Sequence, residues 1–291
     1  MDRALALIVN PTAGGGRALR ALTAVEQALR EAGIAFRVER TRSLQHAGEL
    51  AAAAAQAGEI ATALGGDGLV GAVAGALRGS DPPALLGVLP GGRGNDFARS
   101  LGIPRDAVEA VGVIAAGRER TIDLGEVEGR AFVGIASCGF DSDANRIANA
   151  TRVPGDAAYM WGALRALAGW RPARFELELD GEPLVHVGYN VAVANGRQYG
   201  GGMLIAPGAA LDDGRFDVVT VADVPRRRFL SQLPKVFKGA HVGNPEVEVR
   251  HATEVRIAAD RPFALYADGD PIAELPATVR TLPGAVRVLA P

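Results

Sequence analysis

The stretch that decides the fold reads LLGVLPGGRGNDFAR and covers residues 85–99, where a short apolar run ends in a glycine-rich turn. The pattern occurs twice more, as IATALGGDG at residues 60–68 and as ALALIVNPTAG at residues 4–14. Glycine lets backbone amides approach a phosphate closely, because no Cβ lies in the way. In an open parallel sheet the carboxyl ends of the strands meet at one edge, where ligands bind. The three turns therefore predict a site for a nucleoside triphosphate.

The first 122 residues alternate between strand-like and helix-like segments. Strands are expected at residues 4–9, 35–41, 60–64 and 85–89, and helices at residues 17–32, 45–57, 69–77 and 106–116. A glycine stands one or two residues after each helix, which is typical of a left-handed C-terminal cap. This rhythm predicts an α/β nucleotide-binding domain over residues 1–122, with a parallel sheet and right-handed crossovers.

The pattern changes after Arg120. Hairpins are expected from residues 121–127 with 130–137 and from residues 175–179 with 183–194. Further strands are expected at residues 216–221, 246–250, 254–258, 263–267 and 285–289, and helices at residues 156–168 and 226–237. These segments predict a mainly antiparallel β-sandwich domain over residues 123–291. They leave open whether its last strand returns to the first domain.

Composition and charge narrow the class of protein. A hydrophobic fraction of 48% and a charged fraction of 22% predict a packed core. The formal net charge of −2 argues against a nucleic-acid binder, because such proteins usually carry a basic surplus. Cys138 is the only cysteine, so no intrachain disulfide can form, and a small buried side chain is expected. No apolar run is long enough for a signal peptide or a bilayer span, so a cytoplasmic protein is expected.

The polar residues of the turns each have two interpretations. Asp67 lies between glycines, where a carboxylate beside a polyphosphate needs a cation, so it is expected to hold Mg²⁺. The alternative is that Asp67 caps the helix at residues 69–77. Asn95 and Asp96 are expected to contact ribose, phosphate or metal, and the alternative is capping of a short helix at residues 96–101. Asn10 and Gly14 are expected to present amide groups to phosphate, unless their turn is an ordinary connection.

The motifs of the chain resemble, in the right order, those of the diacylglycerol kinase / sphingosine kinase family of lipid kinases, and most closely its bacterial soluble members. They are the three turns, Thr41 with His46-Ala47, LDDGRFD at residues 211–217 and DGD at residues 268–270. The resemblance covers nearly the whole chain. It implies that ATP and lipid meet between an α/β domain and a β-sandwich domain. It also implies phosphoryl transfer from ATP to a lipid hydroxyl, with diacylglycerol as the leading acceptor and Mg²⁺ as cofactor.

The resemblance further implies roles for individual residues. Asp268 and Asp270 match the block that supplies the general base, with Asp270 in place of the family's usual glutamate. A structural Mg²⁺ away from the active centre would be bound by Asp213 and by the backbone carbonyls of Ala210 and Arg215. Both blocks could otherwise be plain Asp-Gly turns. The expected nucleotide-binding residues are Asn10, Pro11, Thr12, Gly14, Thr41, Gly65, Gly66, Asp67, Gly68, Gly92, Arg93, Gly94, Asn95 and Asp96.

The chain departs from the family pattern at four positions. Leu69 stands where threonine is usual, Gly71 and Ala72 where asparagine and glutamate are usual, and Arg93 where threonine is usual. Arg93 is expected to offer its guanidinium to the phosphates instead. Two alternatives stay open. One is an NAD kinase-like enzyme, which shares the Gly-Gly-Asp-Gly turn. The other is a non-catalytic nucleotide or lipid sensor, which would explain the lost polar groups.

Two segments are candidates for contact with lipid. Residues 226–238 carry five basic side chains, a pattern that suits a helix on anionic headgroups and equally a helix with a solvated face. Trp161 and Trp170 would either line an acyl-chain entrance or fill the core. Transient peripheral contact with the inner face of the membrane is therefore expected. Nucleic acid is not an expected partner, and a homodimer is left open.

Overall fold

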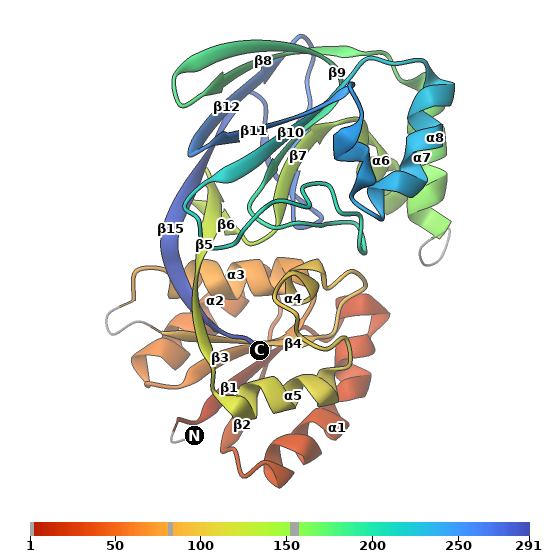
Figure 1. Ribbon diagram of the computed structural model, residues 1–291. Helices are drawn as coiled ribbons and strands as arrows, with labels where there is room; N and C mark the ends of the chain where they lie inside the picture. Colours follow the sequence, from red (N-terminus) through yellow and green to blue (C-terminus); the bar gives the residue numbers. More distant parts are fainter. Residues whose placement is uncertain (1–2, 81–83, 152–156) are drawn as a thin grey trace.

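The computed structural model describes residues 3–80, 84–151 and 157–291, and it has two bodies joined by long strands (Figure 1). The first body contains parallel strands in the spatial order β4-β3-β1-β2. They are β1 (Leu5–Val9), β2 (Phe36–Arg40), β3 (Ile60–Gly65) and β4 (Leu85–Pro90). The helices are α1 (Arg17–Glu31), α2 (Leu44–Gln56), α3 (Asp67–Leu77), α4 (Asp96–Ser100) and α5 (Ala107–Ala116), preceded by the 3-10 turn η1 (Ala13–Gly15).

Burial explains why these segments form a sheet covered by helices. Every residue of β1, β3 and β4 is buried, as expected of parallel strands that have helices on both faces. Helix α1 buries Ala18, Leu22, Val25 and Leu29, which form one stripe at helical spacing. The glycines that follow α1, α2, α3 and α5 all have positive φ, which confirms the expected left-handed caps.

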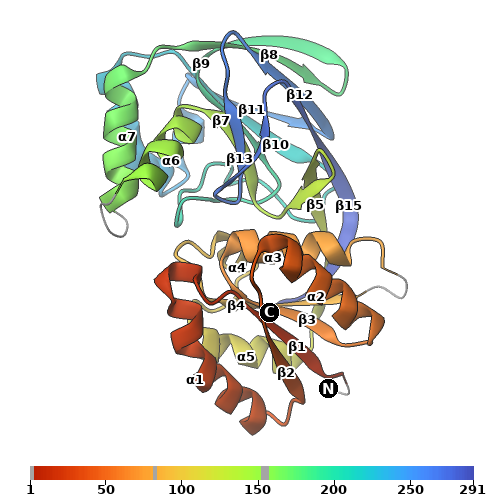
Figure 2. The ribbon, with the colours of Figure 1, turned by 180° about the vertical axis from the view of Figure 1, so that it is seen from behind.

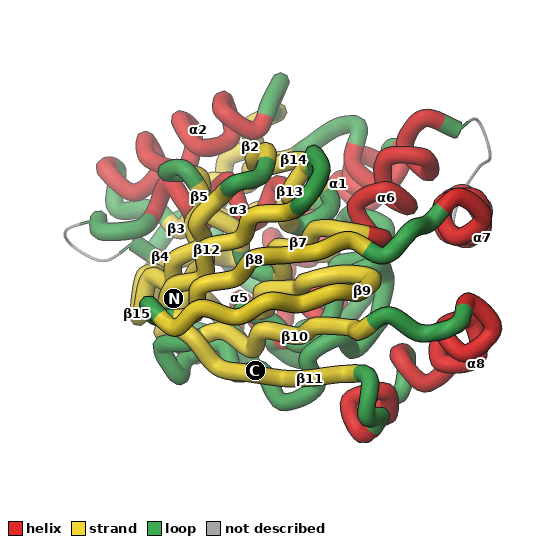
Figure 3. The backbone as a smooth tube through the Cα atoms, turned by 90° about the horizontal axis from the view of Figure 1, so that it is seen from above, coloured by secondary structure: helices red, strands yellow, loops and turns green. Residues whose placement is uncertain are grey.

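The second body is built from antiparallel strands, with helices gathered at one end (Figures 2 and 3). Its strands are β5 (Glu119–Val127), β6 (Arg130–Phe132), β7 (Ile135–Gly139), β8 (Ala173–Leu179), β9 (Glu182–Ala194), β10 (Phe216–Ala222), β11 (Val247–Ala252), β12 (Glu254–Ala259), β13 (Ala264–Ala267), β14 (Asp270–Glu274) and β15 (Ala277–Leu289). Its helices are α6 (Phe140–Ala150), α7 (Ala157–Gly169), α8 (Arg226–Val236) and the 3-10 turn η2 (Ala240–Gly243). The predicted fold class, a parallel α/β body followed by a mainly antiparallel β body, is confirmed.

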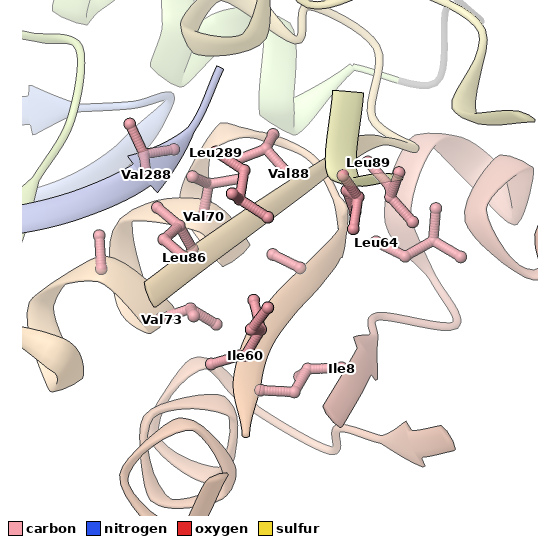
Figure 4. Close-up of a cluster of buried hydrophobic side chains, with 14 of the residues drawn as sticks. Ile8, Ile60, Leu64, Val70, Val73, Leu86, Val88, Leu89, Val288 and Leu289 are labelled. Carbon is pink, nitrogen blue, oxygen red and sulfur yellow. The ribbon is translucent and has the colours of Figure 1, made fainter. Parts of the chain in front are cut away.

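Strand β15 belongs to both bodies. Its first half pairs with β12, and its second half pairs in parallel with β4, where Arg287 and Val288 lie opposite Leu85 and Leu86. Val288 and Leu289 therefore lie in the apolar core of the first body, beside residues of β3, β4 and α3 (Figure 4). The position of the site depends on this link, because β5 and β15 are the long strands that connect the two bodies. The expected domain boundary at residues 122–123 lies inside β5 and stays a prediction.

One sequence-based assignment is wrong, and two elements were not predicted. Residues 130–137 are not one strand but two, β6 and β7, because the backbone leaves the ladder at Val133 and Gly134. No helix was predicted at residues 140–150, although Asp141 and Asp143 in the first turn of α6 are typical of a helix start. Strand β14 was not expected either, because Asp270-Pro271 reads as the continuation of a turn.

Two further expectations concern burial and membrane spans. Cys138 is fully buried, and burial raises its thiol pKa well above the usual value, so it behaves as a small apolar side chain. Within the described ranges, no helix combines the length and the apolar character that a bilayer crossing requires.

Candidate active site

Asp67 connects the second and third glycine turns. It is the first residue of α3, and its carboxylate accepts hydrogen bonds from the backbone amides of Asp96 (3.1 Å) and Phe97 (2.9 Å). Asp67 thus caps α4, the helix after the third turn, and not the helix that it begins. Burial raises the pKa of its carboxyl group, while these two amides oppose the rise.

The three turns touch one another at the carboxyl edge of the parallel sheet. A Cβ on Gly92 would lie 2.5 Å from the Cα of Gly66, and a Cβ on Gly14 would lie 2.7 Å from the carbonyl oxygen of Gly91. Both distances are shorter than side-chain carbons tolerate, so these glycines are required by close packing of backbone against backbone. The turns form one continuous backbone surface.

Asp96 is buried beside Asp67. Its Oδ2 accepts a hydrogen bond from the amide of Gly201 (2.8 Å), whereas its buried Oδ1 has no hydrogen-bond partner among the described residues. Burial raises the pKa of Asp96, and the neighbouring charge of Asp67 raises it further. Two carboxylates that repel each other, one with an unpartnered oxygen, form a donor set that suits a hard cation.

Asp268 brings the second body to the second turn. Its carboxylate accepts hydrogen bonds from the amides of Val133 (2.8 Å) and Gly134 (2.9 Å), and its φ of +52° places it in the left-handed region. A Cβ on Gly71 would lie 3.0 Å from Oδ2 of Asp268, so the side chain faces α3. Burial, followed by the charges of Asp67 and Asp270, raises the pKa of Asp268 to about 7.

A cleft of about 450 Å³ separates α2 and α3 from the strands that carry these acids. The α3 wall consists of small residues, Gly68, Gly71, Ala72 and Gly75, and the opposite wall includes Asp268 and Asp270. Oδ2 of Asp270 lies 2.8 Å from where a Cβ on Gly68 would be, so both acids reach the helix. Two of the four departures from the family pattern, Gly71 and Ala72, thus widen this cleft.

Comparison with known proteins bears on this geometry. Residues 4–127 match the family model of the diacylglycerol kinase catalytic domain, and residues 134–290 match that of the YegS C-terminal NAD kinase beta sandwich-like domain. A protein of Mycobacterium tuberculosis named "Diacylglycerol kinase" is 36% identical over 294 residues, which cover 98% of this chain and 94% of the relative. The chain belongs to the diacylglycerol kinase family. It is a lipid kinase of this family, and family membership implies the use of ATP.

Other relatives agree at the level of the family. A Bacillus subtilis protein named "Diacylglycerol kinase" is 30% identical over 98% of this chain and 95% of its own length. A Pseudomonas fluorescens protein named "Probable lipid kinase YegS-like" is 35% identical over 78% of this chain and 76% of its own length. A crystal structure of a diacylglycerol kinase from Bacillus anthracis aligns with a TM-score of 0.77 and 22% identity, over 99% of this chain and 97% of the other. At that identity the structure supports the fold alone.

The first turn of the lipid kinase is held by its own side chains. Oδ1 of Asn10 accepts hydrogen bonds from the amide (3.0 Å) and hydroxyl (2.9 Å) of Thr12. Thr41 is buried after β2, and its hydroxyl donates to the carbonyl oxygen of Ser43, the residue that caps α2. Asn95 accepts a hydrogen bond from the amide of Gly92 (2.8 Å). These polar groups shape the turns from within.

Arg93 faces a different hollow from that of Asp268. It lines a pocket of about 320 Å³ with three more arginines, Arg17, Arg99 and Arg105. In the described parts of the chain, the ion pairs involve other arginines, so none of these four guanidiniums forms one. Asp106 also lines the pocket, and its carboxylate caps α5. Arg99 is close enough to Asp67 and Asp96 to lower both their pKa values. The pocket is therefore a cationic hollow beside the paired acids.

The expected structural metal site has a different arrangement. Asp213 forms an ion pair with Arg215 (3.0 Å) within its own turn. Asp123, which the sequence did not single out, holds this turn: its carboxylate accepts from the amides of Gly214 and Gly284, each at 2.7 Å. Among the described residues, no three acidic, histidine or cysteine side chains converge as a metal cluster. Binding of Mg²⁺ by Asp213 with Ala210 and Arg215 thus stays a prediction.

Sequence reasoning missed the partners of the acids. Val133, Gly134 and Gly201 act through their backbone amides, for which side-chain chemistry gives no signal. Asp123 could have been found, because it is a carboxylate between the apolar residues Ile122 and Leu124, and the structure shows it buried. Trp170 is buried against Phe140 and Tyr189, so it fills the core, whereas Trp161 is 48% exposed.

Proposed function

We propose that this lipid kinase transfers the γ-phosphoryl group of ATP to the free hydroxyl of diacylglycerol and releases ADP and phosphatidic acid. The observation that carries the proposal is the meeting of Asp268 with the Asp67 turn across the cleft between the two bodies. The names of the Mycobacterium tuberculosis and Bacillus subtilis relatives support diacylglycerol as the acceptor.

Asp268 is the proposed general base. A general base works best when its pKa is close to the operating pH, because it is then largely deprotonated and still binds a proton well. The pKa of Asp268, about 7, meets this condition. The carboxylate would take the proton of the acceptor hydroxyl while the oxygen bonds to the γ-phosphorus, and the bond from that phosphorus to the bridging oxygen of ADP breaks. The two amides that hold Asp268 each occupy one lone pair, so each oxygen keeps one for the proton.

Asp67 and Asp96 are the proposed ligands of Mg²⁺. The unpartnered Oδ1 of Asp96 and the mutual repulsion of the two acids favour a bound cation. When bound, Mg²⁺ neutralises charge on the phosphates. The chain itself would contribute the amides of the three turns and the guanidinium of Arg93, which bind and orient the polyphosphate.

An apolar pocket of about 100 Å³ between α8 and strands β9–β10 supports a lipid acceptor. Its lining includes Phe140, Met203, Val219, Phe229 and Val236. This volume is below that of pockets that enclose a whole drug-sized ligand, so it fits part of one acyl chain. The remainder of the lipid would stay at the surface or in a membrane.

The end of the second body that carries α7 and α8 is the proposed membrane contact (Figures 1 and 3). Trp161 and Leu164 of α7 are 48% and 49% exposed, and Phe237 at the end of α8 is 54% exposed. Helix α8, which ends at Phe237, also carries exposed basic residues, and these suit an anionic lipid surface. Arg228 is an exception, because it forms an ion pair with Glu246. We infer a protein of the cytoplasm that contacts the inner face of the membrane.

A phosphate-transfer screen tests this function. Radiolabelled ATP would be offered with dispersed diacylglycerol, phosphatidylglycerol, ceramide and sphingoid bases, using the wild-type protein and Asp268→Asn. Labelled phosphatidic acid from the wild type alone supports the proposal. A labelled product from another lipid would mean that the protein is a lipid kinase whose acceptor is not diacylglycerol. Binding of ATP with no labelled lipid would instead select the non-catalytic sensor.

A further inference from the structure

A glycine-rich loop joins the apolar pocket to the paired acids. It follows β9, and its residues Gly200, Gly201 and Gly202 have φ values of +61°, +85° and +114°. Three successive left-handed residues are accessible to glycine alone, so the sequence builds a bend here that other residues would not form. Tyr199 and Met203 on either side of the bend pair with each other through backbone hydrogen bonds, which close the loop.

One side of this loop holds Asp96. The amide of Gly201 donates to Oδ2 of Asp96 (2.8 Å), and the side-chain amide of Gln198 donates to its carbonyl oxygen (3.3 Å). A Cβ on Gly202 would lie 2.7 Å from Nη1 of Arg99, so the loop packs closely on α4. The direction in which Asp96 points is therefore set by a loop of the other body.

The opposite side of the loop ends in the apolar pocket. The hydroxyl of Tyr199 donates to Oδ2 of Asp141 (2.7 Å), and Tyr199, Asp141 and Met203 all line the pocket. Asp141 is 3% exposed, and its Oδ1 accepts from the amide of Ser142. A buried carboxylate is costly unless it is hydrogen-bonded. Oδ2 of Asp141 accepts from Tyr199 at 2.7 Å and, at the longer distance of 3.5 Å, from the side-chain amide of Asn190.

We propose that Tyr199 and Asp141 are a positioning pair through which an acyl chain in the apolar pocket fixes the glycine loop and thereby holds Asp96 in place for the nucleotide. The inference rests on the proposed lipid kinase reaction and adds a coupling between its two substrates. An acyl chain that packs on Tyr199 and Met203 restricts the loop, and a restricted loop keeps Gly201 on Asp96. By linkage, nucleotide binding at Asp96 must then favour acyl binding by the same factor.

Tyr199→Phe removes only the hydroxyl of the pair, and Tyr189→Phe is its matched control. Tyr189 is also a buried tyrosine of the second body, and its hydroxyl donates to the carbonyl oxygen of Val224 (2.9 Å). Asp141→Asn is the conservative variant, because the asparagine carbonyl can still accept from Tyr199. Three measurements follow: hydrogen exchange of the Gly201 amide, the dissociation constant of magnesium-bound AMP-PNP, and kcat and KM with the acceptor that the wild type uses.

In Tyr199→Phe we expect exchange at Gly201 to be about tenfold faster and AMP-PNP binding to be about fivefold weaker. We also expect kcat to fall and, by linkage, the acceptor KM at saturating ATP to rise by a factor similar to the loss of AMP-PNP affinity. Tyr189→Phe should match the wild type at both sites, and Asp141→Asn should lie between.

Unchanged exchange and nucleotide affinity in Tyr199→Phe, or a rise in acceptor KM alone, would overturn the proposed role of the pair. So would equal effects in Tyr189→Phe. A wild type that phosphorylates no lipid would refute the proposed function, while exchange and nucleotide binding would still decide the role of the pair.

Discussion

Oδ1 of Asp67 lies 2.9 Å from the backbone nitrogen of Phe97, so a carboxylate on the second glycine turn caps the helix that follows the third. The positive end of α4 attracts this carboxylate, which stabilises both partners. The two turns consequently depend on one side chain for their relative position. Any ligand bound by both turns would find them already assembled, which reduces the entropy lost on binding.

Two replacements of Asp67 should therefore distinguish its effect on activity from its effect on stability. Asp67→Asn keeps one oxygen that can accept from an amide, so the protein should fold, but its lipid phosphorylation rate should fall at least about 100-fold because a charged ligand is lost. Asp67→Ala should also lose about 1 kcal/mol of unfolding free energy, as other helix caps do. Initial rates and urea unfolding measure the two effects.

Asp180 provides the control for Asp67. Its carboxylate also accepts hydrogen bonds from backbone amides, those of Thr253 and Glu254, at the hairpin between β8 and β9. Asp180→Asn should lower the stability without changing the rate. A full phosphorylation rate in Asp67→Asn would remove this residue from the proposed site.

The pH profile distinguishes Asp268 from Asp270 as the base. A base works when deprotonated, so kcat/KM should rise with pH and level off above a midpoint near the Asp268 pKa of about 7. Asp270→Asn removes a charge that raises this pKa, and its midpoint should move to lower pH with most of the rate retained. Asp268→Asn should lose the pH dependence and at least about 100-fold in rate. If Asp270→Asn loses the rate and Asp268→Asn keeps it, the roles are reversed.

Gly92 offers a test of the contact between turns. A Cβ there would lie 2.5 Å from the Cα of Gly66, with backbone on both sides, so Gly92→Ala should push the second and third turns apart. We expect ATP binding to weaken at least about tenfold, by titration calorimetry. Gly112→Ala is the matched control, because nothing lies within 4 Å of its Cβ position in α5. That change should leave ATP binding intact and add about 1 kcal/mol of stability, as alanine does within helices.

The fold was predictable because its signals are local. Apolar runs that end in glycine turns located β1, β3 and β4, and the glycines after the helices located the caps. The split of residues 130–137 was not predictable in this way. It depends on Asp268, which lies more than 130 positions later and takes the amides of Val133 and Gly134 out of the ladder. A pairing at that separation has no local pattern.

The candidate site was predictable only in part for the same reason. The acids of the turns and of the DGD block were chosen from the sequence, and the structure places Asp67 beside Asp96 and close enough to Asp268 to raise its pKa. Their orientation comes from amides and from the loop at Gly201, which carry no distinctive side chains. The roles of these residues in catalysis stay predictions until the variants are measured.

Arg93 should contribute to ATP binding through charge. It shares a hollow with Arg17, Arg99 and Arg105, and these four positive charges outnumber the one carboxylate of the lining, Asp106, which favours an anion. Arg93→Ala should raise KM for ATP about tenfold with little change in kcat. The defect should shrink at high salt, because salt screens the same interaction in the wild type. Arg256→Ala, an exposed arginine of β12, should leave KM unchanged. An unaltered KM in Arg93→Ala would indicate that the phosphates do not reach this hollow.

The exposed apolar residues of α7 should govern binding to membranes. Trp161 and Leu164 are 48% and 49% exposed, so changing both to serine removes little packing and should leave the melting temperature unchanged. Inserting two such side chains into a bilayer is worth about 1.5–3 kcal/mol each, so co-sedimentation with phosphatidylglycerol-containing vesicles should weaken at least about tenfold. Val185 and Val187 of β9 are equally exposed, at 50% and 47%, and the same change there should have no effect. Equal losses from both pairs would mean that vesicle binding follows overall hydrophobicity and that α7 is not the contact.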